Sequence, residues 1–277
     1  MTAHDGTKTW LITGATNGLG RVWARAALER GDRVVATGRR IERLDDLVAV
    51  HGDALLPLRL DVADRQAVLE AVATAHEHLG RLDVVVNGAG YGQWGMVEEL
   101  TERELREQLE TNVLGTVWVT QAVLPILRRQ RSGHVVQVTS EGGVRAYPGI
   151  GAYHASKWAV EGLSESLAQE VAGFGIHVTC VEPGPYDTGF SGAIRRSAPM
   201  PEYDAVRAAD ASTFSLGDPT ATAAAVLRLV DAERPPRRLV LGDVVPAIVG
   251  IHEERIATWR AWEDVSLAAF GGERAKA

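Results

Sequence analysis

Residues 9–20 have the sequence TWLITGATNGLG, in which a short apolar run is followed by a glycine-containing turn and the start of a helical pattern. Gly14, Gly18 and Gly20 are spaced as G-x-x-x-G-x-G. Glycine permits a tight turn and lets the backbone approach a pyrophosphate closely. The helix behind such a turn offers unpaired N–H groups and a favourable dipole. Three glycines are a weak signal alone, but their position after an N-terminal strand favours a dinucleotide site.

Six further apolar runs follow along the chain, and helical patterns fill the gaps between them. The runs are residues 32–38, 54–62, 82–90, 133–140, 175–184 and 237–242. The helical patterns cover residues 18–30, 41–50, 64–79, 102–131, 152–173 and 219–233. The runs hardly alternate with polar residues, which indicates strands covered on both faces of a parallel sheet. The sequence therefore predicts an α/β, Rossmann-type doubly wound fold of about seven strands, as a single domain over residues 1–277.

Two regions do not fit this alternation. Residues 185–217 form a long connection rich in Pro, Gly and Ser, and connections of this length are usually functional. We expect it to be a substrate loop. Residues 246–272 predict a C-terminal helical extension with Ile251, Trp259, Trp262 and Leu267 as apolar anchors. Packing of this helix on its own domain is favoured, and a subunit contact remains the alternative.

The composition excludes several classes of protein. Lys plus Arg is 29 and Asp plus Glu is 36, a net charge of −7, which argues against nonspecific nucleic-acid binding. Cys180 is the only cysteine, so no intrachain disulfide can form, and we expect no metal site. No apolar stretch approaches the ~18 residues of a membrane-spanning helix, and the start does not resemble a signal peptide. The expectation is a cytoplasmic protein without a membrane partner.

Tyr153 and Lys157 are four residues apart in a helical pattern. Residues i and i+4 share one face of a helix, so the phenol and the ammonium should be neighbours. A nearby cation lowers a phenol pKa of ~10 by ~1–3 units, which would allow proton transfer near neutral pH. An ordinary surface pair is the alternative. His154 lies about 100° around the helix from Tyr153, so we do not expect it to act as a base.

The end of the second predicted strand bears on cofactor choice. Sites that prefer NAD usually carry a carboxylate there, bonded to the ribose 2′-hydroxyl. Here Gly38 fills that position, and Arg39 and Arg40 follow. A guanidinium pairs well with the 2′-phosphate of NADP. The sequence therefore predicts NADP(H) over NAD(H), with Arg39 as the first contact; a solvated arginine pair that caps a loop is the alternative.

Taken together, these motifs resemble the short-chain dehydrogenase/reductase family from residue 9 to about 188. TGATNGLG matches the family's TGxxxGxG, and the Tyr153/Lys157 pair matches its YxxxK. Asp61 in LDV matches the aspartate of the adenine pocket, and NGAG (87–90) matches NNAG with Gly88 as the departure. Each match is weak alone, but their joint order is specific.

Three further matches complete the resemblance. Asn112 in TNVLG matches the helix asparagine of the family's proton relay. Ser140 precedes Tyr153 by the usual interval, 153 − 140 = 13 residues. PGPYDT (183–188) matches PGxxxT, whose threonine often reaches the nicotinamide carboxamide.

The resemblance implies an NADP(H)-dependent oxidoreductase that interconverts a ketone or aldehyde and an alcohol. Tyr153 would be the general acid/base, and Ser140 would hold the carbonyl oxygen. Lys157 would lower the pKa of Tyr153 and bind the nicotinamide ribose, while Asn112 would bind a water linked to Lys157. The implied cofactor contacts are Gly14, Thr16, Asn17, Gly18, Leu19, Gly20, Arg39, Arg40, Asp61, Val62, Asn87, Gly88, Ala89, Gly90, Tyr153, Lys157, Pro183, Gly184 and Thr188.

The substrate pocket should form from segments near the strand ends and from the long loop. Those segments offer Tyr91, Gln93, Trp94, Glu141, Val144, Tyr147, Tyr186 and Phe190, and the loop adds Met200, Tyr203 and Phe214. Most are apolar or aromatic, so the resemblance implies a hydrophobic or aromatic small-molecule carbonyl or alcohol. The alternative is that half of these aromatic residues belong to the core.

Two other functions compete with this hypothesis. A non-catalytic dinucleotide sensor would keep the glycine loop but tend to lose Tyr153 or Lys157, and both are present. An epimerase or dehydratase on a nucleotide sugar would usually carry a substantial C-terminal domain, whereas about 35 residues follow the last predicted strand. The resemblance also implies a homodimer or homotetramer, because the family commonly pairs the helices here at 102–131 and 152–173 across a two-fold axis.

Overall fold

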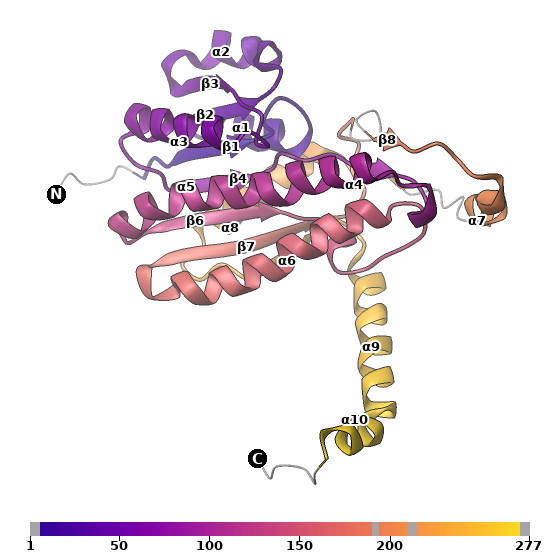
Figure 1. Cartoon of the computed structure of the whole chain (residues 1–277). Coiled ribbons are helices and arrows are strands. Elements are labelled where there is room, and N and C mark those ends of the chain that lie inside the picture. Colours follow the sequence, from indigo (N-terminus) through magenta and orange to yellow (C-terminus); the bar gives the residue numbers. More distant parts are fainter. Residues whose placement is uncertain (1–5, 190–193, 210–214, 272–277) are drawn as a thin grey trace.

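A computed structural model describes residues 6–189, 194–209 and 215–271 of the chain. Seven parallel strands form one sheet in the order β3-β2-β1-β4-β6-β7-β9 (Figure 1). The strands are β1 (Thr9–Thr13), β2 (Arg33–Gly38), β3 (Leu55–Arg59), β4 (Val84–Asn87), β6 (Gly133–Val138), β7 (Ile176–Pro183) and β9 (Arg238–Leu241). Each lies inside one of the seven apolar runs, so the predicted doubly wound α/β fold is confirmed.

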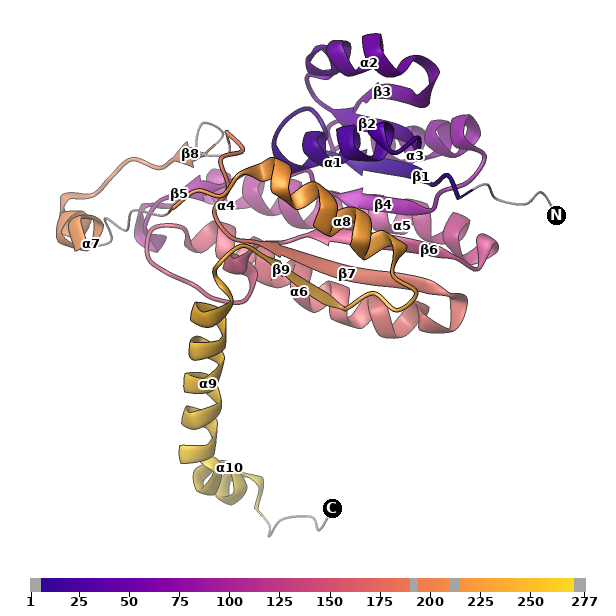
Figure 2. The same ribbon diagram turned by 180° about the vertical axis from the view of Figure 1, so that it is seen from behind.

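Helices cover both faces of the sheet (Figures 1 and 2). On one face lie α1 (Gly18–Glu29) and α8 (Thr222–Asp231), and on the other α3 (Arg65–Leu79), α5 (Gly115–Gln130) and α6 (Gly151–Val171). Successive residues of a strand point to opposite faces. Trp10 and Ile12 accordingly pack under α1, while Leu11 between them packs in the core on the other face. Burial on both sides explains why the strand sequences do not alternate.

The chain reverses its direction across the sheet between β1 and β4, which pair side by side from Trp10↔Val84 to Thr13↔Asn87. In such folds ligands bind in the crevice at this switch point. Gly14 follows β1 with a φ of 70°, and a Cβ added there would lie 2.6 Å from the carbonyl oxygen of Gly88. The turns after β1 and β4 therefore approach each other closely, and only glycine fits at Gly14.

The helical pattern at 102–131 consists of three pieces. They are α4 (Glu102–Leu109), a π-helical turn (Glu110–Leu114) and α5. Thr101 caps α4, since its hydroxyl accepts from the Glu104 N–H at 3.2 Å. Asn112 lies in the π turn and is buried.

The 185–217 segment leaves the sheet after β7 and returns before α8. Its ends are joined, because the Gly217 N–H donates to the Pro185 carbonyl and the Asp187 N–H to the Gly217 carbonyl, both at 3.0 Å. In between, β8 (Arg195–Arg196) pairs in parallel with β5 (Gln93–Trp94), and α7 (Asp204–Ala209) follows. Figure 1 shows this excursion to the right of the sheet. It lies on the side of the molecule that holds the predicted site.

After β9 the chain forms α9 (Val245–Ala261) and α10 (Glu263–Phe270), which project away from the sheet (Figures 1 and 2). Ile248 in the second turn of α9 is buried against Val144 and Val244. By contrast, Trp259 is 68% exposed and Trp262 is 62% exposed. The favoured packing of this helix on its own domain is therefore wrong for its outer half, because α9 points away from the sheet. None of the described helices is long and apolar enough to cross a membrane.

Candidate active site

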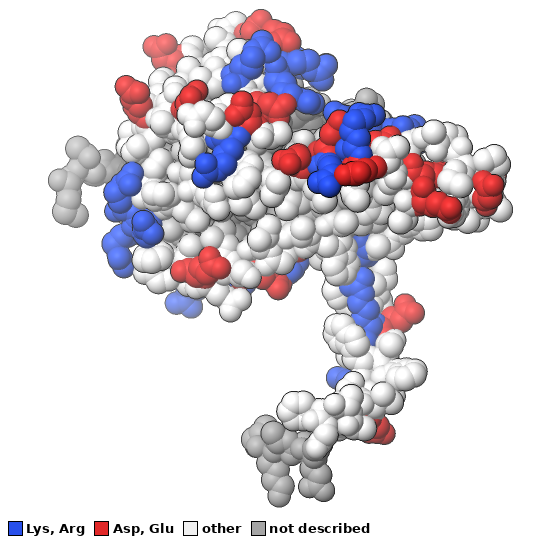
Figure 3. All heavy atoms as spheres, in the orientation of Figure 1, with Lys and Arg blue, Asp and Glu red and all other residues white. Residues whose placement is uncertain are grey.

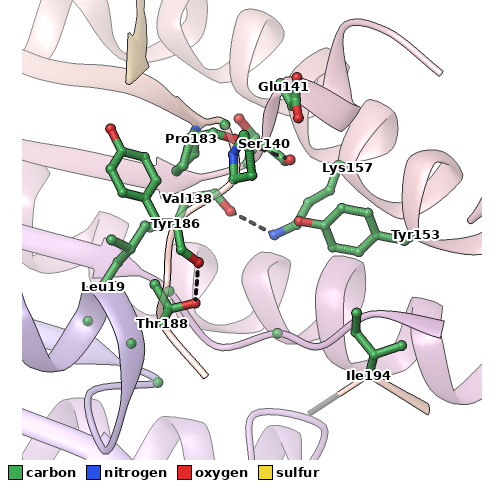
Figure 4. A pocket seen from close by; sticks show the side chains of 18 of the residues that line it. Leu19, Val138, Ser140, Glu141, Tyr153, Lys157, Pro183, Tyr186, Thr188 and Ile194 are labelled. Atoms are coloured by element: carbon green, nitrogen blue, oxygen red, sulfur yellow. Dashed lines mark hydrogen bonds between the residues drawn. The ribbon is translucent and has the colours of Figure 1, made fainter. Parts of the chain in front are cut away.

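A cavity of about 370 Å³ lies at the carboxyl ends of the strands, where β1 and β4 meet. Its walls come from the turns after β1, β4, β6 and β7, from the first turns of α1 and α6, and from the 185–217 segment (Figure 4). It therefore brings together segments far apart in the sequence, including the glycine turn and the Tyr153/Lys157 helix.

The first turn of α1 forms one end of the cavity. Gly18, Leu19 and Gly20 line it, and Asn17 at the N-cap makes no side-chain capping bond. A Cβ at Gly20 would lie 2.7 Å from the Gly14 carbonyl oxygen, so the turn is packed as tightly as backbone allows. Backbone N–H groups at the start of a 12-residue helix favour an anion. These residues fit the pyrophosphate of a nicotinamide dinucleotide.

The opposite end of the cavity holds Ser140, Tyr153 and Lys157 (Figure 4). Ser140 follows β6, and its hydroxyl accepts from the Gly142 N–H at 3.0 Å and bonds to Tyr153. Lys157 donates from Nζ to the Val138 carbonyl at 2.8 Å and lies 5.6 Å from the centre of the Tyr153 ring. The structure thus brings the three residues together, as their spacing predicts.

Burial changes the proton affinities of this group. It raises the pKa of the Tyr153 hydroxyl above its usual range, and the bond from Ser140 only partly opposes this. The expected lowering by Lys157 is therefore wrong in direction, because desolvation of the phenolate outweighs the effect of neighbouring groups. Burial lowers the pKa of Lys157 to about 8, against the opposing charge of Glu161. Near neutral pH Tyr153 is a protonated donor, and Lys157 is mostly charged.

Asn112 is held by protein partners beside this group. Its Nδ2 donates to the Tyr91 carbonyl and the Ser156 hydroxyl, both at 3.0 Å, and its Oδ1 accepts from the Tyr91 N–H at 3.1 Å. A Cβ at Gly90 would lie 3.1 Å from Asn112 Oδ1 and 3.7 Å from Lys157 Nζ. Asn112 and Lys157 thus approach Gly90 together, although Asn112 does not line the cavity.

His154 is buried and holds the turn that follows Ser140. Its Nδ1 lies 2.9 Å from the Gly142 carbonyl oxygen, and its Nε2 accepts from the Tyr147 N–H at 3.2 Å. Both ring nitrogens are therefore engaged with backbone. Burial lowers the pKa of His154, which favours the neutral ring.

The predicted cofactor contacts divide into two sets. Besides Tyr153 and Lys157, those that line the cavity are Gly14, Asn17, Gly18, Leu19, Gly20, Gly88, Gly90, Pro183, Gly184 and Thr188. Those that do not are Thr16, Arg39, Arg40, Asp61, Val62, Asn87 and Ala89. Asp61 is exposed and accepts from the Ala63 N–H at 3.1 Å, whereas Asn87 is buried and donates to Gln137 Oε1 at 2.9 Å.

Gly38 and the two arginines after it lie at the end of β2. A Cβ at Gly38 would lie 2.6 Å from Thr16 Cγ2, so a side chain at this position would require Thr16 to shift. Arg39 and Arg40 are exposed, and among the described residues their guanidinium groups have no hydrogen-bond or ion-pair partner. Two positive groups are therefore available beside this strand end.

The rest of the cavity wall is mainly apolar. Four of the predicted pocket residues line the cavity: Trp94, Glu141, Tyr147 and Tyr186. The cavity is also lined by residues that the sequence analysis did not predict, namely Val138, Thr139, Ile150, Pro185, Asp187, Ile194 and Leu216. Ile194 and Leu216 come from the irregular 185–217 segment, whose path no periodicity reveals. Glu141 is buried, its carboxylate pairs with Arg145, and burial raises its pKa.

The prediction that Tyr91 and Gln93 line the pocket needs correction. Gln93 is buried between Gln108, which accepts from its N–H at 2.8 Å, and Ser197, which accepts from its Nε2 at 2.9 Å. Tyr91 lies under the Arg195 guanidinium, 4.3 Å from its ring centre. Both support the β5–β8 pairing instead.

The remaining pocket candidates also lie elsewhere. Val144 packs with Ile248, and the Tyr203 hydroxyl donates to Glu98 Oε2 at 2.6 Å. Neither they nor Met200 line the cavity. Phe190 and Phe214 lie outside the described residues.

Comparison with known proteins agrees with this geometry. The family model described as short chain dehydrogenase matches residues 8–199. The oxidoreductase BOA17 of Botryotinia fuckeliana is 42% identical over 272 residues, which cover 95% of this chain and 99% of the relative. A crystal structure of a short-chain dehydrogenase from Streptomyces avermitilis is also 42% identical, with a TM-score of 0.90 over 95% of this chain and 99% of that one.

Matched structures include complexes with nicotinamide dinucleotides. An alcohol dehydrogenase from Thermococcus sibiricus, complexed with 5-hydroxy-NADP, is 29% identical, with a TM-score of 0.73 over 85% of this chain and 96% of that one. Complexes with NADP and with NADH both occur among further matches. From the family match and the extent of these similarities, the chain belongs to the short-chain dehydrogenase family and is an oxidoreductase.

Proposed function

We propose that the chain is an NADP(H)-dependent carbonyl reductase in which Tyr153 is the general acid/base. The observation that carries this proposal is the bond between the Ser140 and Tyr153 hydroxyls in the cavity wall, with Lys157 beside them. A carbonyl oxygen placed between two hydroxyl donors is polarised and can receive a proton from the nearer acid. This arrangement suits the reduction of a ketone or aldehyde.

Each residue has a distinct part in the reaction. NADPH, when bound along the glycine turn, supplies the hydride. Ser140 donates to the carbonyl oxygen and stabilises the negative charge that develops there. Tyr153 gives its proton to that oxygen, and its raised pKa keeps the proton on the phenol until the stronger base forms. Lys157, held by the Val138 carbonyl, places a positive charge beside the phenolate that results.

The end of β2 supports the preference for NADP. Arg39 is exposed without a protein partner among the described residues, and Gly38 carries no carboxylate that would repel a 2′-phosphate. A hydrogen bond to a charged group contributes about 1.5–3 kcal/mol. Since about 1.4 kcal/mol is a factor of ten, one such contact gives NADP roughly a ten- to hundredfold advantage.

The cavity walls support a hydrophobic or aromatic small-molecule substrate. The cavity that holds Ser140 and Tyr153 is also lined by Trp94, Tyr147, Ile150, Ile194 and Leu216. Apolar walls with few convergent polar groups are typical of sites for small organic ligands. We also propose that the chain acts as a homodimer or homotetramer in which α5 and α6 pair with their counterparts.

The test is a panel of ketones, aldehydes and alcohols assayed by nicotinamide absorbance, with NADPH and NADH side by side. We expect turnover of apolar ketones, faster at low concentrations of NADPH than of NADH. Binding of NADPH without turnover of any substrate would favour the alternative, a non-catalytic dinucleotide sensor. Turnover by Tyr153→Phe equal to that of the wild type would exclude the assigned acid.

A further inference from the structure

The C-terminal helices divide into a root that is attached to the domain and an arm that is not. The root ends at Arg255, whose Nη1 donates to the Val144 carbonyl at 3.0 Å and whose guanidinium lies 4.7 Å from the Trp158 ring centre. We call residues 256–270 the arm. Its exposed apolar residues are Ile256 (41%), Trp259 (68%), Trp262 (62%), Val265 (57%) and Phe270 (83%). Much of the arm is uncharged in the view of Figure 3.

A short helical arm with exposed apolar side chains is expected to be only marginally stable when it is surrounded by water. Isolated helices shorter than about 12–15 residues are marginal even with good propensity, and most helical stability comes from packing of an apolar face. α10 has 8 residues, and none of them is buried. Clusters of exposed apolar side chains on otherwise soluble proteins mark interaction sites. We propose that the arm binds a second copy of this chain, and that the second copy returns its own arm in exchange.

The available area favours exchange between two copies. A buried Trp or Phe contributes about 150–250 Å². With the exposed fractions above, the arm offers roughly 500 Å², and the surface that receives it loses a similar area. One arm on an unrelated protein therefore buries roughly 1,000 Å², below the 1,200–2,000 Å² of stable interfaces, whereas two exchanged arms reach roughly 2,000 Å².

The surface next to the root is suited to a close neighbour. On α6, Trp158 is 40% exposed and Leu163 is 47% exposed, and a Cβ at Gly162 would meet nothing within 4 Å. Glycine inside a helix costs about 1 kcal/mol, but it lets another backbone approach closely. Because the Arg255 guanidinium lies over the Trp158 ring, these exposed residues of α6 adjoin the start of the arm. In a two-fold assembly each copy supplies both an arm and the exposed surface of α6, so the same contact forms twice and the assembly is a closed dimer.

Two relatives extend over part of the C-terminal helices. The fungal and Streptomyces proteins each match 95% of this chain. The remaining 5% of 277 residues is about 14 residues, fewer than the 26 residues of 245–270 (270 − 245 + 1), so both matches include part of these helices. A second copy exists wherever the chain does.

The test compares the wild type with Trp259→Glu/Trp262→Glu by sedimentation velocity and light scattering over a wide dilution range. The few residues that dominate an interface are enriched in Trp, and truncating one of them costs at least about 2 kcal/mol. We therefore expect the dissociation constant of the assembly to rise by at least about 100-fold, at 1.4 kcal/mol for each factor of ten. Val50→Glu is the matched control, since Val50 is 75% exposed on α2 (Asp45–His51), far from the arm in sequence, and should change nothing.

A second measurement uses only the wild type, in case the variant does not fold. Hydrogen exchange at the amides of 256–270 should be slow in concentrated protein and fast after dilution. A monomeric wild type, exchange that is independent of concentration, or an assembly unaffected by the double substitution would each overturn the proposal. The inference rests on the proposed self-association, and the last outcome would leave pairing through α5 and α6 intact. Carbonyl reduction, assayed in the same samples, tests the proposed function separately.

Discussion

The two ends of the proposed dinucleotide site hold their positive groups in opposite ways. At the proposed catalytic end, Lys157 of α6 is 7% exposed and donates to the Val138 carbonyl. At the end of β2, Arg39 and Arg40 are exposed, and their guanidinium groups have no partner among the described residues. The groups proposed to take part in the reaction are positioned by the protein interior, whereas the groups proposed to recognise the cofactor obtain their partner only from the ligand.

The difference follows from the cost of burying charge. A charge in the interior must be compensated by hydrogen bonds and opposite charge. Lys157 accordingly donates to the Val138 carbonyl, and the negative charge of Glu161 raises its pKa against the effect of burial. An exposed arginine is compensated by water and salt. Substitutions at the catalytic end should therefore remove activity, and substitutions at the β2 end should change only which cofactor binds.

The largest effect is expected for Tyr153→Phe. Loss of the proton donor should lower kcat by about 10²–10⁴-fold, while the affinity for NADPH changes little. Tyr203→Phe is the control, because the Tyr203 hydroxyl bonds to Glu98 and does not line the cavity. Steady-state kinetics and fluorescence titration measure the two quantities. Near wild-type turnover by the pure Tyr153→Phe variant would show that Tyr153 is not the general acid.

Arg39→Leu should have the next largest effect, at the other end of the site. We expect NADP affinity to fall roughly ten- to hundredfold, with NAD affinity unchanged, because one charge-assisted bond is lost. Arg43→Leu, an exposed arginine four residues further on, serves as the control. Gly38→Asp is a poorer test, since its Cβ would collide with Thr16. Equal wild-type affinities for both cofactors, or equal losses in the variant, would show that Arg39 does not bind the phosphate.

Glu161→Gln should alter the pH dependence of the catalytic end. Glu161 is buried one helical turn after Lys157, and its charge raises the Lys157 pKa against the lowering by burial. Without that charge the pKa of Lys157 falls below its value of about 8. The ammonium is then lost at lower pH, so the alkaline fall of kcat/KM for ketone reduction should move to lower pH.

Arg238 offers a matched control for this substitution. It pairs with buried Glu161 and also with Glu165, whose side chain is 57% exposed. Glu165→Gln removes a partner of the same arginine without removing buried charge near Lys157. The control profile should superimpose on that of the wild type. Identical profiles for Glu161→Gln and the wild type would argue against coupling of Glu161 to Lys157.

Salt should produce the smallest effect and should separate the two ends directly. The screening length falls from about 10 Å at 0.1 M to about 3 Å at 1 M ionic strength. The exposed arginines should therefore lose part of their attraction for NADP, and its dissociation constant should rise a few-fold more than that of NAD. The kcat at saturating NADPH should not change, since Lys157 is buried. A kcat that fell with the NADP affinity would contradict the contrast between the two ends.

The sequence predicted the parts of the molecule that depend on local pattern. Strands buried on both faces appear as unbroken apolar runs, as the division of Trp10 and Leu11 between two cores shows. The register of Tyr153 and Lys157 follows from helix geometry alone. The direction of the Tyr153 pKa could not be predicted, because it depends on how far tertiary contacts bury the phenol. Ile194 and Leu216 were missed, since an irregular excursion brings them to the cavity.

The arm shows a different limit of sequence analysis. Its periodicity predicts helices, and the helices are present. Periodicity states which residues are apolar but not what they touch, so Trp259 and Trp262 were assigned to a core that does not lie beneath them.

The π turn at Glu110–Leu114 has a consequence for how the gene for this chain can change. Such a turn is equivalent to an insertion into a regular helix. Deleting one residue there would restore ordinary helical hydrogen bonding and turn α4 by about 100° relative to α5. Gln108, which now donates to the Tyr91 carbonyl at 2.9 Å, and Asn112 could then no longer hold the same backbone. A scan of single-codon deletions through residues 102–125 should lose activity most steeply at 110–114, even where the shortened helix is the more stable one. Homologous proteins should therefore tolerate most substitutions in this segment better than they tolerate a change in its length.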